Sequence, residues 1–265
     1  GGGAADDAPA VSVAGAAVVE GTDNHAVFTV SLSNASTSDV SFNLALANST
    51  ALGGGVDYGT GGAGNLQVFV GGVWVDAASA TIAAGQTSVQ VRTPVSDDLL
   101  DESSETFTLT AAVTAGTTSN ASAAGTGTIS DNDGAPSVTI DDVTRNEAAG
   151  TITFTVTLDA PSALAVSVDY ATVAGTATGA DYAAGVDGLS GTLSFAAGVT
   201  SQTITLAIVD DAVFEASESF VINLSNAVNA ALGDGQGVGT IRDDGTGGGG
   251  TDDDTPSLSV SGAAV

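Results

Sequence analysis

The sequence predicts an all-β protein made of tandem antiparallel β-sandwiches of about seven strands each. Three observations lead to this prediction: apolar and polar residues alternate in short segments, no segment has helical periodicity, and the same motifs recur along the chain. The 265 residues leave room for two domains of about 100–150 residues.

The alternation is strictest at residues 151–158, where Thr alternates with apolar residues. One face of that segment therefore carries Ile152, Phe154, Val156 and Leu158, and the other face carries only threonine. Residues 28–32, 204–208 and 220–224 alternate in the same way. A period of two is typical of strands that are buried on one face, and Gly, Asp, Asn and Ser between the segments indicate turns. Hydrophobic residues form 43% of the chain, which is enough for a packed core.

Two motifs repeat and define the predicted domains. Ala8-Pro9-Ala10-Val11-Ser12-Val13 returns in similar form at 135–140 and 255–260, and a Gly-Thr-Ile strand followed by acidic residues closes each repeat at 127–133 and 239–244. We therefore predict a linker at 1–7, domains at 8–133 and 135–244, a Gly/Asp linker at 245–254, and the first strand of a third repeat at 255–265. No run of 18 apolar residues and no signal-peptide pattern occurs, so the sequence resembles an interior segment of a longer protein.

The charge balance is strongly acidic and excludes several classes of partner. The chain has 31 acidic residues, only Arg92, Arg145 and Arg242 as basic residues, and a net charge of −28. Nucleic acid and anionic membrane surfaces both require basic residues, so we expect neither, and no direct membrane insertion. Because the chain has no cysteine, disulfides and thiolate metal sites are excluded. Calcium is then the obvious alternative for stabilising an extracellular protein.

Acidic residues recur at matching places in both domains. Each domain has a Glu after its first strand, an Asp-Tyr pair in its middle, an Asp-Asp-x-x-x-Glu-x-x-Glu segment between two strands, and acids after its last strand. In the first domain these are Glu20, Asp57, Asp97, Asp98, Glu102, Glu105, Asp131 and Asp133. In the second they are Glu147, Asp181, Asp210, Asp211, Glu215, Glu218, Asp243 and Asp244.

Carboxylates from several loops at one end of a sandwich repel one another unless a cation lies between them. Calcium takes six to eight oxygen ligands, which matches such a set. The recurrence of the set in two otherwise diverged halves predicts a Ca²⁺ site in each domain. The alternative interpretation is that these acids are solvated loop residues.

The second domain resembles a Calx-beta domain. The resemblance rests on residues 175–182 (GTATGADY), 191–198 (GTLSFAAG) and 210–226, and it covers the whole repeat. It implies an immunoglobulin-like sandwich that holds several calcium ions in loops at one end. The ligands that it implies are the eight acids of the second domain, with Val213 contributing its carbonyl oxygen.

The first domain departs from this pattern. Residues 64–75 resemble an inserted hairpin, a variant similar to repeats of giant bacterial adhesins, and Asp57 follows Gly-Gly-Gly-Val rather than the Gly-Thr-Ala stretch that precedes Asp181.

An enzymatic function is not expected. With His25 as the single histidine and no cysteine, a repeated nucleophilic triad is impossible. Paired carboxylates could serve a glycosidase, but such an enzyme needs aromatic platforms, and aromatic residues are only 5% of this chain. We interpret Trp74 as hairpin packing rather than as a sugar platform.

The leading hypothesis is a calcium-rigidified extender or adhesin stalk within a large secreted or bacterial cell-surface protein. Its expected partners are calcium ions and neighbouring repeats of the same protein. A second hypothesis is a self-assembling extracellular filament, a homopolymer in which the strand around Pro256–Val260 adds to a neighbouring copy. A third is a ligand-binding adhesin tip.

Overall fold

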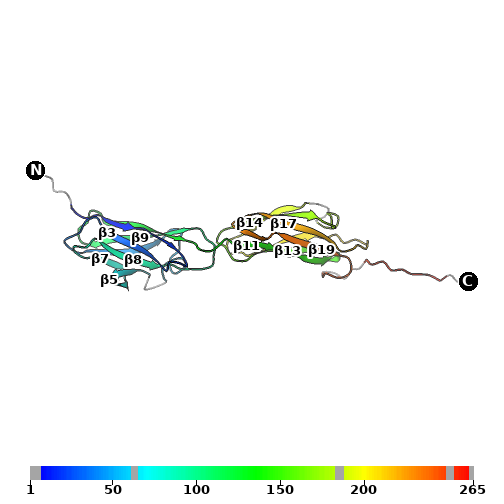
Figure 1. Cartoon of the computed structure of the whole chain (residues 1–265), viewed down its shortest axis with the longest axis horizontal. Coiled ribbons are helices and arrows are strands. Elements are labelled where there is room, and N and C mark those ends of the chain that lie inside the picture. The colour runs from blue at the N-terminus through cyan, green and yellow to red at the C-terminus, as the bar shows by residue number, and fades with distance from the viewer. Residues whose placement is uncertain (1–6, 61–64, 183–187, 249–253, 263–265) are drawn as a thin grey trace. The chain divides into compact units, whose positions relative to one another are not determined.

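The computed structural model describes residues 7–60, 65–182, 188–248 and 254–262. The chain divides into two compact units, Gly1–Asp133 (unit 1) and Gly134–Val265 (unit 2). Both consist almost entirely of β-strands, several of which are labelled in Figure 1, so the all-β prediction is confirmed. No helix within the described ranges is long and apolar enough to cross a membrane.

Unit 1 contains two five-stranded sheets. The first has the order β1 (Val11–Ala14), β3 (His25–Leu32), β8 (Ser88–Pro94), β5 (Gln67–Val70) and β6 (Val73–Asp76). The second has the order β2 (Ala16–Val19), β10 (Ser122–Ser130), β9 (Glu105–Ala115), β4 (Val40–Asn48) and β7 (Ser79–Ile82). All neighbours are antiparallel except β2 and β10, which are parallel.

Unit 2 pairs a four-stranded sheet with a five-stranded sheet. The first has the order β16 (Ser201–Ala207), β13 (Thr151–Leu158), β11 (Ser137–Ile140) and β18 (Ala231–Asp234). The second has the order β12 (Val143–Asn146), β19 (Gln236–Arg242), β17 (Glu218–Val228), β14 (Val166–Ala174) and β15 (Ser190–Phe195). A single 3₁₀ turn among the described residues, Glu147–Ala149, follows β12.

Both units have more strands than the seven expected, in part because the first strand of each is split between the two sheets. In unit 1 the chain changes sheets at Gly15, where a Cβ atom would lie 2.6 Å from the carbonyl oxygen of Thr126. In unit 2 it changes sheets at Asp141 and Asp142, whose carboxylates accept the backbone N–H groups of Thr155 at 2.6 Å and Val238 at 2.7 Å. One segment of the chain therefore contributes a strand to both sheets of its unit.

The alternating residues of the strands form the cores. Phe28, Val30, Phe154 and Val156 are completely buried, whereas the threonines between them are exposed or half-buried. Burial of one face of each strand is the main stabilising term, because apolar area removed from water contributes about 25 cal/mol per Å².

The departure of unit 1 at residues 64–75 is a β-hairpin in the structure. Strands β5 and β6 are joined by Gly71 and Gly72, whose φ angles of 60° and 88° suit a two-residue hairpin turn. Trp74 packs on Phe69 with 5.1 Å between ring centroids, and the Arg92 guanidinium lies 4.3 Å from the Trp74 ring. Trp74 therefore contributes to hairpin packing, while Gly64 lies outside the described residues.

Residues 254–262 have no regular secondary structure. Leu258 and Val260 are 95% and 89% exposed. The assignment of 255–265 to a third repeat, like the other domain bounds, stays a prediction. Residues 1–6 and 249–253 of the two predicted linkers lie outside the described ranges.

Candidate metal centre

Among the residues that the structure describes, two groups of three carboxylates form in each unit. Within a group, one oxygen from each residue lies within 4.8 Å of the others. The groups of unit 1 are Glu20, Asp131 and Asp133, and Asp57, Glu102 and Glu105. The groups of unit 2 are Glu147, Asp243 and Asp254, and Asp181, Glu215 and Glu218. We call the group that contains Glu20 or Glu147 the inner group and the other the outer group.

A buried tyrosine holds the aspartate of each outer group. The ring of Tyr58 stacks on Phe107 with centroids 4.0 Å apart, and the ring of Tyr182 stacks on Phe220 at the same distance. Because Asp57 and Asp181 directly precede these tyrosines, the core fixes the position of both aspartates. The Asp-Tyr motif thus joins a buried aromatic ring to a predicted ligand.

The same aspartates also position the segment that follows β8 or β16. The carbonyl oxygen of Asp57 accepts the N–H of Ser96 at 3.0 Å, and that of Asp181 accepts the N–H of Val209 at 2.9 Å. The Asp-Asp pairs at 97–98 and 210–211 follow immediately. The loop that carries Asp57 or Asp181 therefore positions the start of the loop that carries the Asp-Asp pair.

A glycine in the last strand makes room for the stacked aromatic pair. Gly127 lies opposite Phe107, and Gly239 lies opposite Phe220. A Cβ atom at either glycine would lie 2.5 Å from the facing phenylalanine ring. The glycine of the Gly-Thr-Ile motif therefore leaves space for the phenylalanine ring. Two residues after the isoleucine of that motif come the acids Asp131 and Asp243, at the tip of the sandwich.

The glutamates of the inner groups are, with Asp243, the buried acids among the described residues. Glu20 and Glu147 are only 5% and 4% exposed. In each, the carboxylate oxygen Oε1 is buried and has no hydrogen-bond partner among the described residues. A buried charged oxygen without a donor is costly, so this atom requires a cation or a proton.

The local backbone explains why each glutamate points inward. The N–H of Glu20 donates to the carbonyl oxygen of Ser130 at 3.1 Å, which continues the pairing of β2 with β10. Glu147 begins a 3₁₀ turn whose N-cap is Asn146, a buried residue that accepts the N–H of Ala148 at 3.1 Å. Both glutamates thus follow the second half of the split first strand.

Burial and mutual repulsion raise the pKa of the inner glutamates. Burial raises the pKa of Glu20 to about 8, helped by a hydrogen bond with Asp131 and by the charges of Asp131 and Asp98. Burial raises the pKa of Glu147 to about 7, helped by the charges of Asp243, Asp210, Asp211 and Asp254.

The outer groups behave in the same way. Burial raises the pKa of Glu105 to about 7, with a hydrogen bond to Asp57 as the next cause. Burial also raises the pKa of Glu218 to about 7, with the charge of Asp181 as the next cause. Two carboxyl groups can share a hydrogen bond only if one is protonated, so both groups are poorly suited to full ionisation without a cation.

The inner and outer groups of a unit are adjacent. In unit 2 the Asp243 carboxylate of the inner group accepts the N–H of Glu215, an outer-group residue, at 2.7 Å. The charge of Asp211 raises the pKa of both Glu147 and Glu215. In unit 1 the charge of Asp98 likewise raises the pKa of both Glu20 and Glu102. The Asp-Asp pair therefore lies within electrostatic reach of two groups.

The remaining predicted ligands lie beside the groups rather than in them. Asp98 and Asp211 accept the backbone N–H of Leu100 and Val213, each at 2.8 Å. The preceding aspartates act on the groups through their charge. After burial, which is the largest cause, the charge of Asp97 helps to raise the pKa of Asp133, and the charge of Asp210 helps to raise the pKa of Glu147. Val213 is 60% exposed. Ligand roles for these residues stay predictions.

Asp244 differs from the other predicted ligands. Its carboxylate binds the hydroxyl and the N–H of Thr246 and lies 4.0 Å from the Arg242 guanidinium. The aligned residue of unit 1 is Asn132, which, unlike Asp244, carries no negative charge. The structure does not bring Asp244 into either group.

Sequence reasoning missed Asp254, which was assigned to the linker. Asp133 has no acidic counterpart in unit 2, because the aligned residue is Gly245. That gap was the signal in the sequence for an acid from elsewhere, but Asp254 lies eleven positions after Asp243, outside the repeated motif.

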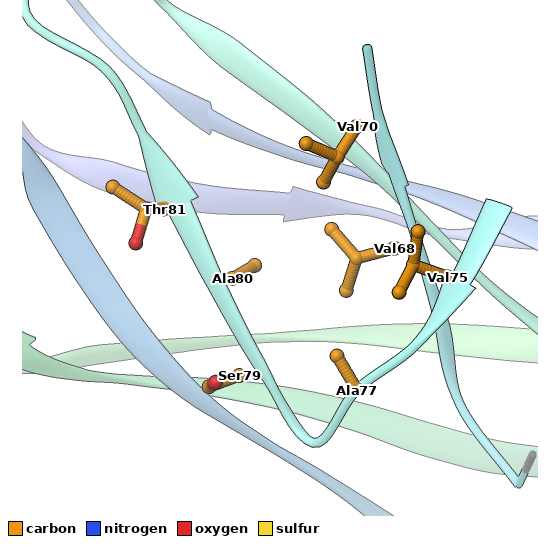
Figure 2. Close-up of a pocket in the computed structure, with 7 residues that line it drawn as sticks. All are labelled: Val68, Val70, Val75, Ala77, Ser79, Ala80 and Thr81. Carbon is orange, nitrogen blue, oxygen red and sulfur yellow. The ribbon is translucent and has the colours of Figure 1, made fainter. Parts of the chain in front are cut away.

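A pocket in unit 1 has a different character. Figure 2 shows it between the β5–β6 hairpin and β7, lined by Val68, Val70, Val75, Ala77, Ala80 and Thr81 among others. None of its lining residues is ionisable. It offers mainly apolar contact, with the hydroxyl-bearing Ser79 and Thr81 as its polar side chains.

Comparison with known proteins identifies the family. The model of the Calx-beta domain matches residues 5–75 and 130–245. This chain belongs to the Calx-beta family. The two matched segments fall in units 1 and 2, so the chain is a tandem of Calx-beta domains with the immunoglobulin-like sandwich of that family.

Several solved structures are similar to the chain. The apo form of the Calx CBD1 domain is 28% identical, with 40% of this chain and 96% of that chain covered and a TM-score of 0.35. CBD12 from CALX1.2 is 18% identical, with 86% and 96% covered and a TM-score of 0.36. A tetra-tandem repeat from the extending region of a large adhesion protein is 16% identical, with 88% and 49% covered and a TM-score of 0.42. No curated protein matches the chain.

Proposed function

We propose that this tandem of Calx-beta domains binds calcium at the inner and outer groups of each unit and serves as a calcium-rigidified extender of a secreted or cell-surface protein. One observation carries the calcium proposal. Glu20 and Glu147 are almost completely buried, and each has a carboxylate oxygen without a hydrogen-bond partner among the described residues. A carboxylate oxygen of each also lies within 4.8 Å of those of two other acids.

The chemistry of the groups favours calcium over other metals. Every member of the four groups is a carboxylate, and the chain has no cysteine and a single histidine that belongs to none of them. Hard oxygen ligands suit calcium, whereas zinc and copper sites use thiolate or imidazole. The neighbouring Asp97, Asp98, Asp210 and Asp211, the carbonyl of Val213 and the carboxylate of Asp244 are the proposed sources of further oxygen ligands.

Calcium would stabilise each unit by neutralising its loops. Extracellular calcium modules commonly bind with dissociation constants of about 10⁻⁴ to 10⁻³ M, so about 1 mM calcium contributes roughly 0.4–1.4 kcal/mol per site. With two groups in each unit, calcium would contribute roughly 0.8–2.8 kcal/mol to that unit, which is substantial beside a total stability of about 5–15 kcal/mol. The stalk role rests on the tandem arrangement, the acidic surface and the acidic tips of the sandwiches.

Thermal unfolding of the full chain tests this proposal. We expect the melting temperature to rise with calcium from a chelator baseline, and calorimetric titration to show saturable calcium binding that equal magnesium does not reproduce. An unchanged melting temperature together with no heat of binding would overturn it.

The exposed segment Pro256–Val260 favours a second candidate, a filament subunit. Leu258 and Val260 alternate with serines and are almost fully exposed, and no strand in the described part of the chain pairs with them. Such a segment can add to a sheet edge of another copy. Light scattering of the purified chain over a range of concentrations tests this: concentration-dependent polymers, lost on Leu258→Asp, support it, and a monomer at every concentration contradicts it.

A further inference from the structure

We infer that Asp254 completes the inner calcium site of unit 2, so that calcium ties the chain beyond the sandwich to that unit. This inference rests on the proposed calcium binding. It assigns a ligand to a position that lies outside the repeated sandwich pattern, and it gives the segment 245–254 a calcium-dependent attachment.

The comparison of the two inner groups carries the first step. In unit 1 the third carboxylate comes from Asp133, two residues after Asp131. In unit 2 the residue two positions after Asp243 is Gly245, which has no side chain. A carboxylate oxygen of Asp254 instead lies within 4.8 Å of those of Glu147 and Asp243. The backbone N–H of Asp254 also donates to Oδ1 of Asp243 at 3.3 Å.

Residues 246–248, which follow the last strand of unit 2, contact residues close to Glu147. The carbonyl oxygen of Gly248 accepts the N–H of Asn146, the buried residue before Glu147, at 3.2 Å. The hydroxyl of Thr246 accepts a hydrogen bond from the Arg242 guanidinium at 3.0 Å. At Gly247 a Cβ atom would lie 3.1 Å from the backbone of Arg145. Residues 246–248 therefore lie against β12, whose end carries Glu147.

An independent observation points to a ligand at this place. Glu147 is 4% exposed, and its Oε1 atom has no hydrogen-bond partner among the described residues. A third negative group close to an unpartnered buried carboxylate oxygen is unfavourable unless a cation joins the three. Calcium between Glu147, Asp243 and Asp254 satisfies all three.

The consequence concerns the chain after Asp254. With calcium bound, Thr255 and the residues that follow leave from a fixed point on unit 2. Without calcium, repulsion among three carboxylates releases Asp254, and the following residues are tethered only at residues 246–248. The attachment of the residues that follow Asp254 thus depends on calcium.

The absence of native cysteine allows a direct experiment. A spin label at Ser257→Cys, an exposed position, reports on the segment, and a label at Ala197→Cys, in the exposed turn between β15 and β16, is the control. We expect calcium to slow the motion of the label at 257 and to leave the label at 197 unchanged. Asp254→Asn should abolish the slowing and weaken calcium binding by at least about tenfold, since loss of even a supporting group around a metal costs about 10–100-fold.

The matched control is Asp234→Asn, at the opposite end of β19 from Asp243. Its Oδ1 accepts the N–H of Gln236, and the asparagine oxygen keeps that bond, so calcium should still slow the label at 257. If calcium binds but does not slow the label, or if Asp254→Asn retains the slowing, the assignment of Asp254 is wrong. If the unsubstituted chain binds no calcium at all, the proposed function itself fails.

Discussion

At the scale of single residues, Glu20 and Glu147 decide the chemistry of the tips. Each is buried as deeply as a core residue, yet each carries an oxygen that no described donor satisfies. Such an arrangement stabilises the fold only when a cation or a proton is present. Each glutamate should therefore stabilise its unit when calcium is bound and destabilise it when calcium is absent.

Replacement of Glu147 by Gln should reverse the sign of its effect with calcium. In chelator at pH 8, Glu147→Gln should stabilise unit 2 by about 1–3 kcal/mol, because it removes a buried charge whose pKa is raised to about 7. In calcium the same change should destabilise unit 2, because a ligand is lost. Denaturant unfolding of both proteins in both conditions measures this. The prediction fails if the variant is less stable than the unsubstituted chain in chelator as well. As a control, Asp234→Asn should leave the stability of unit 2 unchanged both in chelator and in calcium.

At the scale of elements, the last strand of each unit and the long strand that pairs with it antiparallel act together. Strand β17 supplies Glu218 and the phenylalanine that stacks on Tyr182, and β19 supplies the glycine that admits that ring and then the acid Asp243. The same pair recurs as β9 and β10 in unit 1. Packing in the core and ligand position at the tip are thus coupled through two neighbouring strands.

Substitution of Gly239 by Ala tests this coupling. A Cβ atom 2.5 Å from the Phe220 ring should displace the ring and cost about 1–3 kcal/mol of unfolding free energy. Because Tyr182 stacks on that ring, calcium affinity of unit 2 should fall too. The control is Gly134→Ala, where a Cβ atom meets nothing within 4 Å, and we expect a change below about 0.5 kcal/mol. Equal stability of the two variants would show that the ring can move at no cost.

At the scale of the whole chain, negative charge dominates. The net charge is −28 with three arginines, and the pKa values of Glu20, Glu105, Glu147 and Glu218 are all raised to between about 7 and about 8. Each of these groups holds its proton more tightly in the folded chain than in the unfolded chain. Protons and calcium are therefore alternative ways to neutralise the same oxygens.

The pH dependence of stability should differ between the two conditions. In chelator, the stabilisation from these protonated groups is complete below about pH 4.5 and is lost as the pH rises through about 7–8, so the melting temperature should fall between pH 5.5 and pH 8.5. With calcium, the shift produced by the ion should grow over the same range, because protons compete less for the ligands. Melting curves at four or five pH values measure both trends. A chelated chain that is more stable at pH 8.5 than at pH 5.5 would contradict the prediction.

Much of the fold was predictable because it depends on local pattern. Alternation at 151–158 required a strand with one buried face, and the structure confirms the all-β sandwich architecture. The strand count was less predictable, because the split at Gly15 and at Asp141–Asp142 assigns one segment to two sheets. Which sheet a residue joins depends on partners that lie far away in the sequence, such as Thr126 and Val238.

The sequence by itself determined that carboxylates from separate loops gather at the tips, because acids recurred after corresponding strands in both halves. Only the tertiary structure decided how they divide into groups. It placed Asp254 beside Glu147 and turned Asp244 toward Thr246. The physical reason is that distances between carboxylate oxygens depend on how loops from different strands meet, and no sequence spacing encodes a contact made across a sandwich.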